Sequence, residues 1–262
     1  MAAATSIARS ETPVFKRAVI AGLALFALSM LGEALGYGLS GDLAGALVHL
    51  AIGVSALVLA FLVLRFGAWA LALSVVLTVV GWFFFEGYAT AFELSHPESF
   101  FDFMPNLVAL VGTLIAIAGG AVAIRQLRSR DVRLTALPAE RAALGALTFV
   151  LVAIASTSAG LTMASRESVS PQAEAGAALV KMRTLKFSPD RIAVASGEPL
   201  KLVVNNDDPS LHTFTMDDLD IDFELGPGSE RLVELPALDP GSYEFYCAVE
   251  GHESMTGTLE VQ

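Results

Sequence analysis

Long apolar stretches alternate with short polar ones over the first 164 residues of the chain. Five of these stretches can each cross a hydrocarbon layer of about 30 Å, because a helix rises about 1.5 Å per residue. The first is too long, and too plainly followed by four more, to be a cleaved signal peptide. The pattern predicts an all-α transmembrane bundle of five helices, near residues 18–39, 43–64, 69–92, 105–124 and 142–164.

The periodicity changes after residue 164. The segment SRESVSPQAEAGAA has a composition that favours an exposed, unpacked tether. Beyond it, short runs of β-forming residues are separated by turn signals such as SGEP and LDPGS, as in a β-sandwich or small barrel. We therefore expect a helical domain at 1–164, a linker at 165–178 and an all-β domain at 179–262. The predicted strands are 201–204, 212–216, 231–235, 243–247 and 258–261.

Composition supports a membrane location for the first part and an aqueous one for the last. The chain is 54% hydrophobic and 16% charged, and its mean hydropathy of +0.62 is far above that of an ordinary soluble domain. Basic and acidic residues balance up to residue 164, so the net charge of −11 belongs entirely to residues 165–262. This charge would steer the all-β domain toward a basic partner such as a c-type cytochrome, although solubility or adaptation to salt explains it equally well.

Basic residues in the short connections predict the orientation of the bundle. They lie before the first predicted helix, between the second and third, and between the fourth and fifth, whereas the other two connections have none. Because such loops stay in the cytoplasm, we expect a cytoplasmic N-terminus and an extracellular or periplasmic all-β domain. The basic residues concerned are Arg9, Lys16, Arg17, Arg65, Arg125, Arg128, Arg130, Arg133 and Arg141.

The stretch YCAVEGHESM holds the single cysteine of the chain, Cys247, followed by His252 and Met255. A copper ion that changes oxidation state with little rearrangement is held by two imidazoles and a thiolate, with a long axial Met. The second imidazole must come from another strand, and His212 is the one other histidine after residue 164. These four residues predict a mononuclear copper site. The alternative is that Cys247 is a buried thiol without a metal.

At these residues the chain resembles the cupredoxins, the family of plastocyanin and azurin. The resemblance extends over 179–262 and implies an eight-stranded Greek-key sandwich with type 1 copper at one end. It also implies that His252 exposes its ring edge and is the usual route for electrons. Two positions depart from the family pattern: Glu250 stands where Pro is frequent, and Thr213 where Asn is frequent. A backbone amide at either position can still donate to the thiolate, so we expect an altered potential and a retained site.

Other readings of the site are less well supported by the residue set. Zinc accepts a Cys and two His but has little affinity for a thioether. Met216 is the reserve candidate for the axial ligand, while Met182 and Met216 are better read as filler residues. Copper reductases and oxidases need several further histidines, and the whole chain has four. We therefore expect an electron carrier and not an enzyme.

The predicted bundle contains ionisable residues, which are costly inside a membrane. Glu33, His49 and Glu86 each lie about six residues from the outer end of a predicted helix, at one level. They could converge in a polar site that passes copper outward or handles protons, with a quinol as a candidate partner, or they could only order the bundle. Gly112, Gly119 and Gly120 suit close helix packing.

Two functions remain open from the sequence. The first is a membrane-anchored blue-copper protein that transfers single electrons, as a neighbour of a respiratory or photosynthetic complex. The second is a protein that senses, stores or delivers copper without redox turnover. Neither involves a nucleic-acid partner, and in both the bundle contacts the lipid bilayer.

Overall fold

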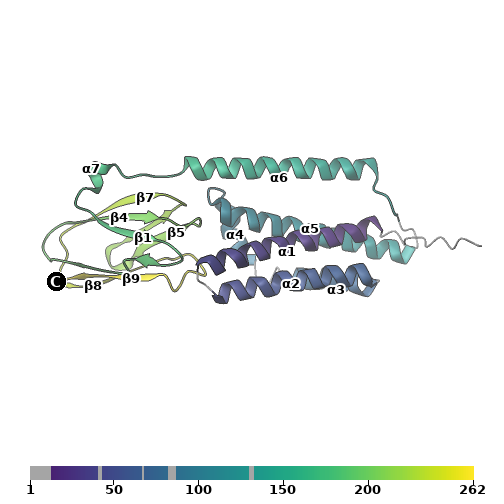
Figure 1. Ribbon diagram of the computed structural model, residues 1–262, viewed down its shortest axis with the longest axis horizontal. Helices are drawn as coiled ribbons and strands as arrows, with labels where there is room; N and C mark the ends of the chain where they lie inside the picture. Colours follow the sequence, from purple (N-terminus) through teal and green to yellow (C-terminus); the bar gives the residue numbers. More distant parts are fainter. Residues whose placement is uncertain (1–12, 41–42, 67, 82–86, 130–132) are drawn as a thin grey trace, which may run out of the picture. The chain divides into compact units, whose positions relative to one another are not determined.

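The computed structural model describes residues 13–40, 43–66, 68–81, 87–129 and 133–262 (Figure 1). Helices α1 to α6 occupy the first part of the described chain and nine strands the last, so the predicted fold class is confirmed. The described residues within 1–32, 48–87 and 107–150 form one compact unit, and those within 33–47, 88–106 and 151–262 form a second. These units cut across the boundaries expected from the sequence, which stay predictions.

Four described helices are long and apolar enough to cross a membrane, and a shorter apolar helix follows the second of them. The third predicted span, 69–92, includes α3 and the beginning of α4, and residues 82–86 between them lie outside the description. The predicted number of five is therefore approximate. The helices are α1 (Val14–Ser40), α2 (Leu43–Arg65), α3 (Ala68–Gly81), α4 (Gly87–Ser95), α5 (Phe100–Ser129) and α6 (Pro138–Ala164).

Helix α5 begins earlier than the sequence pattern predicts. The backbone N–H groups of Asp102 and Phe103 donate to the carbonyl of Ser99, at 3.1 and 2.8 Å. These bonds start the helix at Phe100, and Pro105 lies inside it. A proline near a helix start is tolerated because the first turns leave N–H groups without helical partners. Most of the segment expected to be a loop is thus helical.

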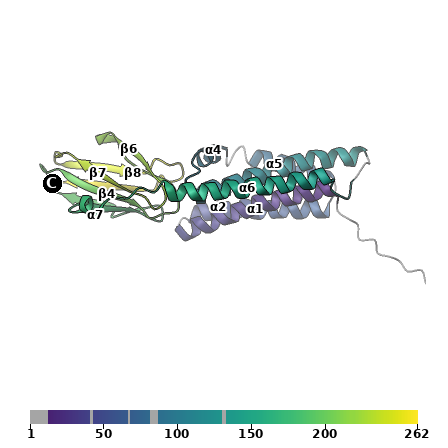
Figure 2. The same ribbon diagram turned by 90° about the horizontal axis from the view of Figure 1, so that it is seen from above.

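Glycines allow α1 and α5, which are labelled in Figures 1 and 2, to approach closely in the first unit. A Cβ atom on Gly22 would lie 2.5 Å from the carbonyl oxygen of Gly112, and one on Gly112 would lie 2.6 Å from that of Gly22. Gly119 approaches Ala18, and Gly120 approaches Val75 of α3. The expected packing role of the small residues in α5 is confirmed.

The strands form two packed sheets, with orders β2-β1-β4-β7 and β3-β9-β8-β5-β6. The chain repeatedly changes sheet between successive strands, and one buried apolar cluster fills the space between the sheets. Met182 and Met216 belong to this cluster. The strands are β1 (Ala178–Met182), β2 (Phe187–Ser188), β3 (Arg191–Val194), β4 (Leu200–Asn206), β5 (His212–Met216), β6 (Ile221–Leu225), β7 (Glu230–Leu235), β8 (Gly241–Tyr246) and β9 (Thr256–Val261).

The segment expected to be an unpacked tether is instead tied to β7. Glu167 forms a two-pronged ion pair with Arg231, at 2.8 and 2.9 Å. Its carbonyl accepts from the N–H of Glu230 at 2.9 Å, and its N–H donates to Ser229 at 3.2 Å. A short helix, α7 (Pro171–Glu174), then begins after Ser170, whose side chain caps it. Composition indicated exposure correctly but could not show these long-range bonds.

Candidate metal centre

Strand register brings the predicted ligands from distant sequence positions to one end of the sandwich. Strand β5 begins at His212 and lies between β6 and β8. Thr215 of β5 pairs with Tyr246 of β8 in antiparallel register, so the chain beyond Tyr246 runs past the start of β5. Cys247 is the next residue after Tyr246, and its thiol is therefore placed beside His212.

The loop from Cys247 to Met255 is closed by its own backbone. The N–H of Cys247 donates to the carbonyl of Met255 at 3.0 Å, and the N–H of Met255 donates to that of His252 at 2.8 Å. Gly251 has φ of 86°, a left-handed conformation that a residue without Cβ adopts at little cost. The loop thus returns to β9 with its three ligand side chains fixed by short-range bonds.

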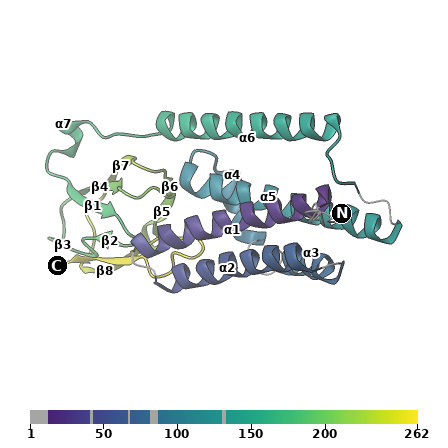
Figure 3. The ribbon, with the colours of Figure 1, turned by 45° about the vertical axis from the view of Figure 1, so that its right-hand side comes forward.

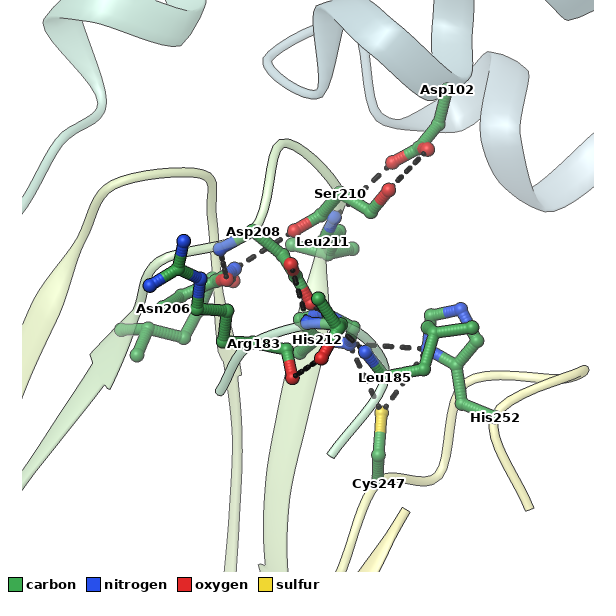
Figure 4. A network of polar contacts seen from close by, with 12 residues as sticks. Asp102, Arg183, Leu185, Asn206, Asp208, Ser210, Leu211, His212, Cys247 and His252 are labelled. Atoms are coloured by element: carbon green, nitrogen blue, oxygen red, sulfur yellow. Dashed lines mark hydrogen bonds and ion pairs between the residues drawn. The ribbon is translucent and has the colours of Figure 1, made fainter. Parts of the chain in front are cut away.

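The donor atoms converge in a buried place (Figure 4). The Sγ atom of Cys247 lies 3.8 Å from Nδ1 of His212 and 3.5 Å from Nδ1 of His252. The two Nδ1 atoms are 3.1 Å apart, and the three residues form a group that could hold a metal ion. Met255 is fully buried in the adjoining core. This donor set fits copper, so His212, Cys247, His252 and Met255 are positioned as a type 1 copper site.

Hydrogen bonds determine which groups of the metal-free site carry protons. Burial disfavours a charged imidazole, but the bond to Asp208 and the neighbouring Cys247 outweigh it and raise the pKa of His212 to about 9. Burial likewise disfavours a thiolate, but bonds from His212, His252 and the N–H of Thr213 lower the pKa of Cys247 to about 5. At neutral pH the metal-free site therefore pairs an imidazolium with a thiolate.

Asp208 is a partner of the site that the sequence analysis missed. Its carboxylate lies 3.0 Å from Nε2 of His212 and accepts from the N–H groups of Thr184 and Leu185, at 2.8 and 3.2 Å. These two residues have φ of 55° and 54°, in the left-handed region, which turns both N–H groups toward the carboxylate. The sequence signal that could have identified Asp208 was its position four residues before His212, in a polar turn.

Thr213 was expected to donate to the thiolate through its backbone, and this is confirmed by a distance of 3.4 Å from its nitrogen to Sγ of Cys247. Its hydroxyl has a second role that was not anticipated, because Oγ1 accepts from the N–H of Ala248 at 2.6 Å. The buried threonine therefore joins the two segments that carry His212 and Cys247.

Two of the three residues of the predicted polar membrane site, Glu33 and His49, lie in the described part of the chain. Glu33 on α1 and His49 on α2 are each half-buried, and they belong to different compact units. Glu86 lies outside the described residues. The convergence of the three side chains stays a prediction.

Comparison with known proteins identifies the class to which the sandwich belongs. Residues 145–261 match the family model described as a Cupredoxin-like domain. The chain therefore contains a cupredoxin domain, a copper-binding electron-transfer module. Cupredoxins are generally electron carriers, and some of their homologues are enzymes.

Solved structures with a similar fold include three proteins of different kinds. A reduced auracyanin from the photosynthetic bacterium Roseiflexus castenholzii is 16% identical over 33% of this chain and 97% of its own, with a TM-score of 0.31. The metal-binding domain of the Cu(I)-exporting P-type ATPase of Streptococcus pneumoniae D39 is 18% identical over 37% and 93%, with a TM-score of 0.30. A copper-containing nitrite reductase from Thermus scotoductus SA-01 is 21% identical over 33% and 22%, with a TM-score of 0.27. A search among curated proteins found no match.

Proposed function

We propose that this chain is a membrane-anchored blue-copper protein that carries single electrons on the outer face of the membrane. The observation that carries the proposal is the convergence of the Nδ1 atoms of His212 and His252 on the Cys247 sulfur inside a buried site. Copper bound by such a donor set supplies a one-electron couple between Cu(II) and Cu(I).

The residues of the chain keep this donor set fixed. Asp208 holds the far nitrogen of His212 at 3.0 Å, and the N–H of Thr213 donates to the sulfur of Cys247. His212 and Met255 have no exposed surface and Cys247 has 3%, so these side chains exclude water. Ligands that cannot move favour electron transfer, because the geometry then suits both oxidation states with little rearrangement.

His252 is the route that we propose for electrons. Its exposed fraction of 9% is the largest of the four ligands. A partner docked at this end would approach the site most closely through the His252 ring. We propose a basic redox protein, such as a c-type cytochrome or a subunit of a respiratory complex, because residues 165–262 carry the whole net charge of −11.

The proposed orientation places the N-terminus in the cytoplasm and the cupredoxin domain outside. Basic residues in the connections expected to be cytoplasmic support it. Within the second compact unit, Ser210 of the sandwich bonds to Asp102 at the start of α5. This bond supports a common side of the membrane for the sandwich and the α4–α5 connection, as the distribution of basic residues requires.

Copper binding and electrochemistry of the purified full-length protein test the proposal. We expect Cu(II) to give an intense blue colour from charge transfer between thiolate and copper, and a reversible wave at an electrode. Cys247→Ser should lose both. A colourless protein that holds only Cu(I) would instead support copper storage or delivery without redox turnover. Retention of tightly bound copper and an unchanged spectrum in Cys247→Ser would overturn the assignment of the site.

A further inference from the structure

Hydrogen bonds within the sandwich hold the loop that leads from β4 to His212. The Asn206 side chain is fully buried and donates to the carbonyl oxygens of Ser210 and Leu225, at 2.8 and 2.7 Å. Its own oxygen accepts from the N–H of Asp208 at 2.9 Å. The buried amide thus fixes the loop just before the first copper ligand.

Asp102 of α5 holds the same loop from its other side (Figure 4). One carboxylate oxygen accepts from the hydroxyl of Ser210 at 2.8 Å, and the other accepts from the N–H of Leu211 at 3.1 Å. The carbonyl of Ser210 and the N–H of Leu211 belong to one peptide group. This peptide group is therefore held at its C=O end by Asn206 and at its N–H end by Asp102, immediately before His212.

Hydrogen bonds from neighbouring residues hold Asp102 in place. The hydroxyl of Ser99 donates to its carboxylate, and its carbonyl accepts from the side chain of Asn106 at 3.1 Å. The Asn106 side chain in turn accepts from the hydroxyl of Thr90 in α4 at 3.1 Å. Ser99, Asn106 and Thr90 are all buried. Helix α4, which precedes α5 as Figure 3 shows, is thereby tied to the first turn of α5.

Phe92, near the end of α4, and His96, directly after that helix, also contact the sandwich. Phe92 packs against its apolar core. His96 Nε2 lies 3.5 Å from a carboxylate oxygen of Glu224 in β6. Glu224 pairs with Thr213 of β5, the residue directly after the ligand His212. The contacts of His96 and Asp102 thus lie next to His212, at the end of the sandwich that carries the metal site.

We propose that the side chains of Phe92, His96 and Asp102 form a docking surface within the chain for the cupredoxin domain, and that Asp102 is a positioning residue for His212. It acts through the peptide group between Ser210 and Leu211, without contact to the metal. The inference rests on the copper site and needs no electron-transfer role. The helical part then does more than anchor the chain, because a change in the conformation of the segment between α4 and α5 would alter the position of His212.

A simpler role for Asp102 is to stabilise the start of α5. Carboxylates in the first turn of a helix interact favourably with its dipole. In that case the loss of Asp102 would weaken the helix and leave the loop before His212 unchanged. The two roles therefore differ in what happens at Ser210 and Leu211.

The test compares Asp102→Ala, Ser210→Ala and the double variant in the full-length protein in lipid nanodiscs. The first measurement is hydrogen exchange of the Leu211 amide in metal-free protein. We expect Asp102→Ala to accelerate it about tenfold or more, since the N–H loses its acceptor. The second is the rate at which a chelator removes Cu(II), where we expect an increase of about tenfold, the lower end of the range for outer partners of metal ligands.

Non-additivity distinguishes positioning from independent effects. If Asp102 acts through Ser210, the double variant should lose copper no faster than Asp102→Ala alone. Asp102→Asn retains one acceptor oxygen and should fall between Asp102→Ala and the unaltered chain, which also provides a milder variant if Asp102→Ala fails to fold. Glu98→Ala is the matched control, because it removes an acid from the same connection and should stay within about twofold in both measurements.

Specific outcomes would overturn the inference. Leu211 exchange and copper loss within twofold of the unaltered chain in Asp102→Ala would leave only the helix-capping role. The inference would also be refuted if the rate of copper loss in the double variant rose by the product of the two single effects, because Asp102 and Ser210 would then act separately. A protein that binds no copper would refute the proposed function, while the exchange of Leu211 in metal-free protein would still test the docking surface.

Discussion

The backbone N–H of Thr213 donates to the sulfur of Cys247 across 3.4 Å, and the hydroxyl of the same threonine accepts from the N–H of Ala248 at 2.6 Å. Thr213 follows one copper ligand, and Ala248 follows another. One buried residue therefore joins the two segments whose register creates the metal site.

Replacing Thr213 by Val should test the hydroxyl separately from the backbone. The N–H of Ala248 would lose its acceptor, and because this bond is only part-buried we expect the loss to cost about 1 kcal/mol of unfolding free energy. The blue colour should persist, because the N–H of Thr213 still reaches the sulfur. Thr213→Ser keeps the hydroxyl and is the control, with a smaller loss in denaturant unfolding of the metal-free protein. Equal stability of the Val and Ser variants would contradict the role of this bond.

Asp208→Asn should weaken Cu(II) binding and raise the reduction potential. The carboxylate stabilises positive charge on the His212 side of the site, and this matters more for Cu(II) than for Cu(I). We expect Cu(II) affinity to fall about 10–100-fold, and about tenfold more than Cu(I) affinity, so the potential should rise by about 60 mV, since 59 mV corresponds to a tenfold change for one electron. Chelator competition and voltammetry measure the two effects.

The control for this change is Asp207→Asn in the same loop. Asp207 pairs with Lys181 at 3.1 Å and is partly exposed, so its charge is well screened. Its replacement should shift the potential much less. Similar shifts in Asp207→Asn and Asp208→Asn would mean that net charge alone, and not the bond to His212, sets the potential.

The strands and the four ligands could be predicted because their signals are local. Alternating runs indicate strands, and Cys247, His252 and Met255 lie on one loop, so a single additional histidine completed the set. Asp208 is near His212 in sequence, but its role depends on the hairpin at Thr184 and Leu185, which only the packed sandwich brings to it.

Asp102 could be recognised as an acid of the expected outer connection, but not as a partner of the metal site. It lies 108 residues before Ser210, and no sequence pattern relates two such distant polar residues.

Copper uptake should release protons in a way that depends on pH. With the pKa of His212 near 9 and that of Cys247 near 5, the metal-free site at pH 7 holds a proton on His212 and none on Cys247. The ligand atom Nδ1 must lose that proton, so copper binding should strengthen as pH rises from 6 to about 9 and then level off.

Below about pH 5 the thiolate also becomes protonated, so a second proton competes and binding should weaken more steeply. Chelator competition at a series of pH values measures this dependence, and a weakly buffered titration at pH 7 should record release of about one proton per Cu(II). Uptake without proton release at pH 7 would contradict the assigned protonation states.

Gly22→Ala should destabilise the first compact unit. A methyl group there would lie 2.5 Å from the carbonyl oxygen of Gly112 and 2.6 Å from the backbone nitrogen of Ala116. Backbone atoms cannot move aside as a flexible side chain can, so α1 and α5 must separate, at a cost of about 1–3 kcal/mol.

Gly36→Ala in the same helix is the control, because no atom lies within 4 Å of the added methyl. It should be neutral or stabilising by up to about 1 kcal/mol, since Ala favours helix. Detergent-induced unfolding followed by circular dichroism compares the two variants, and equal stability would show that α1 and α5 do not depend on this close approach.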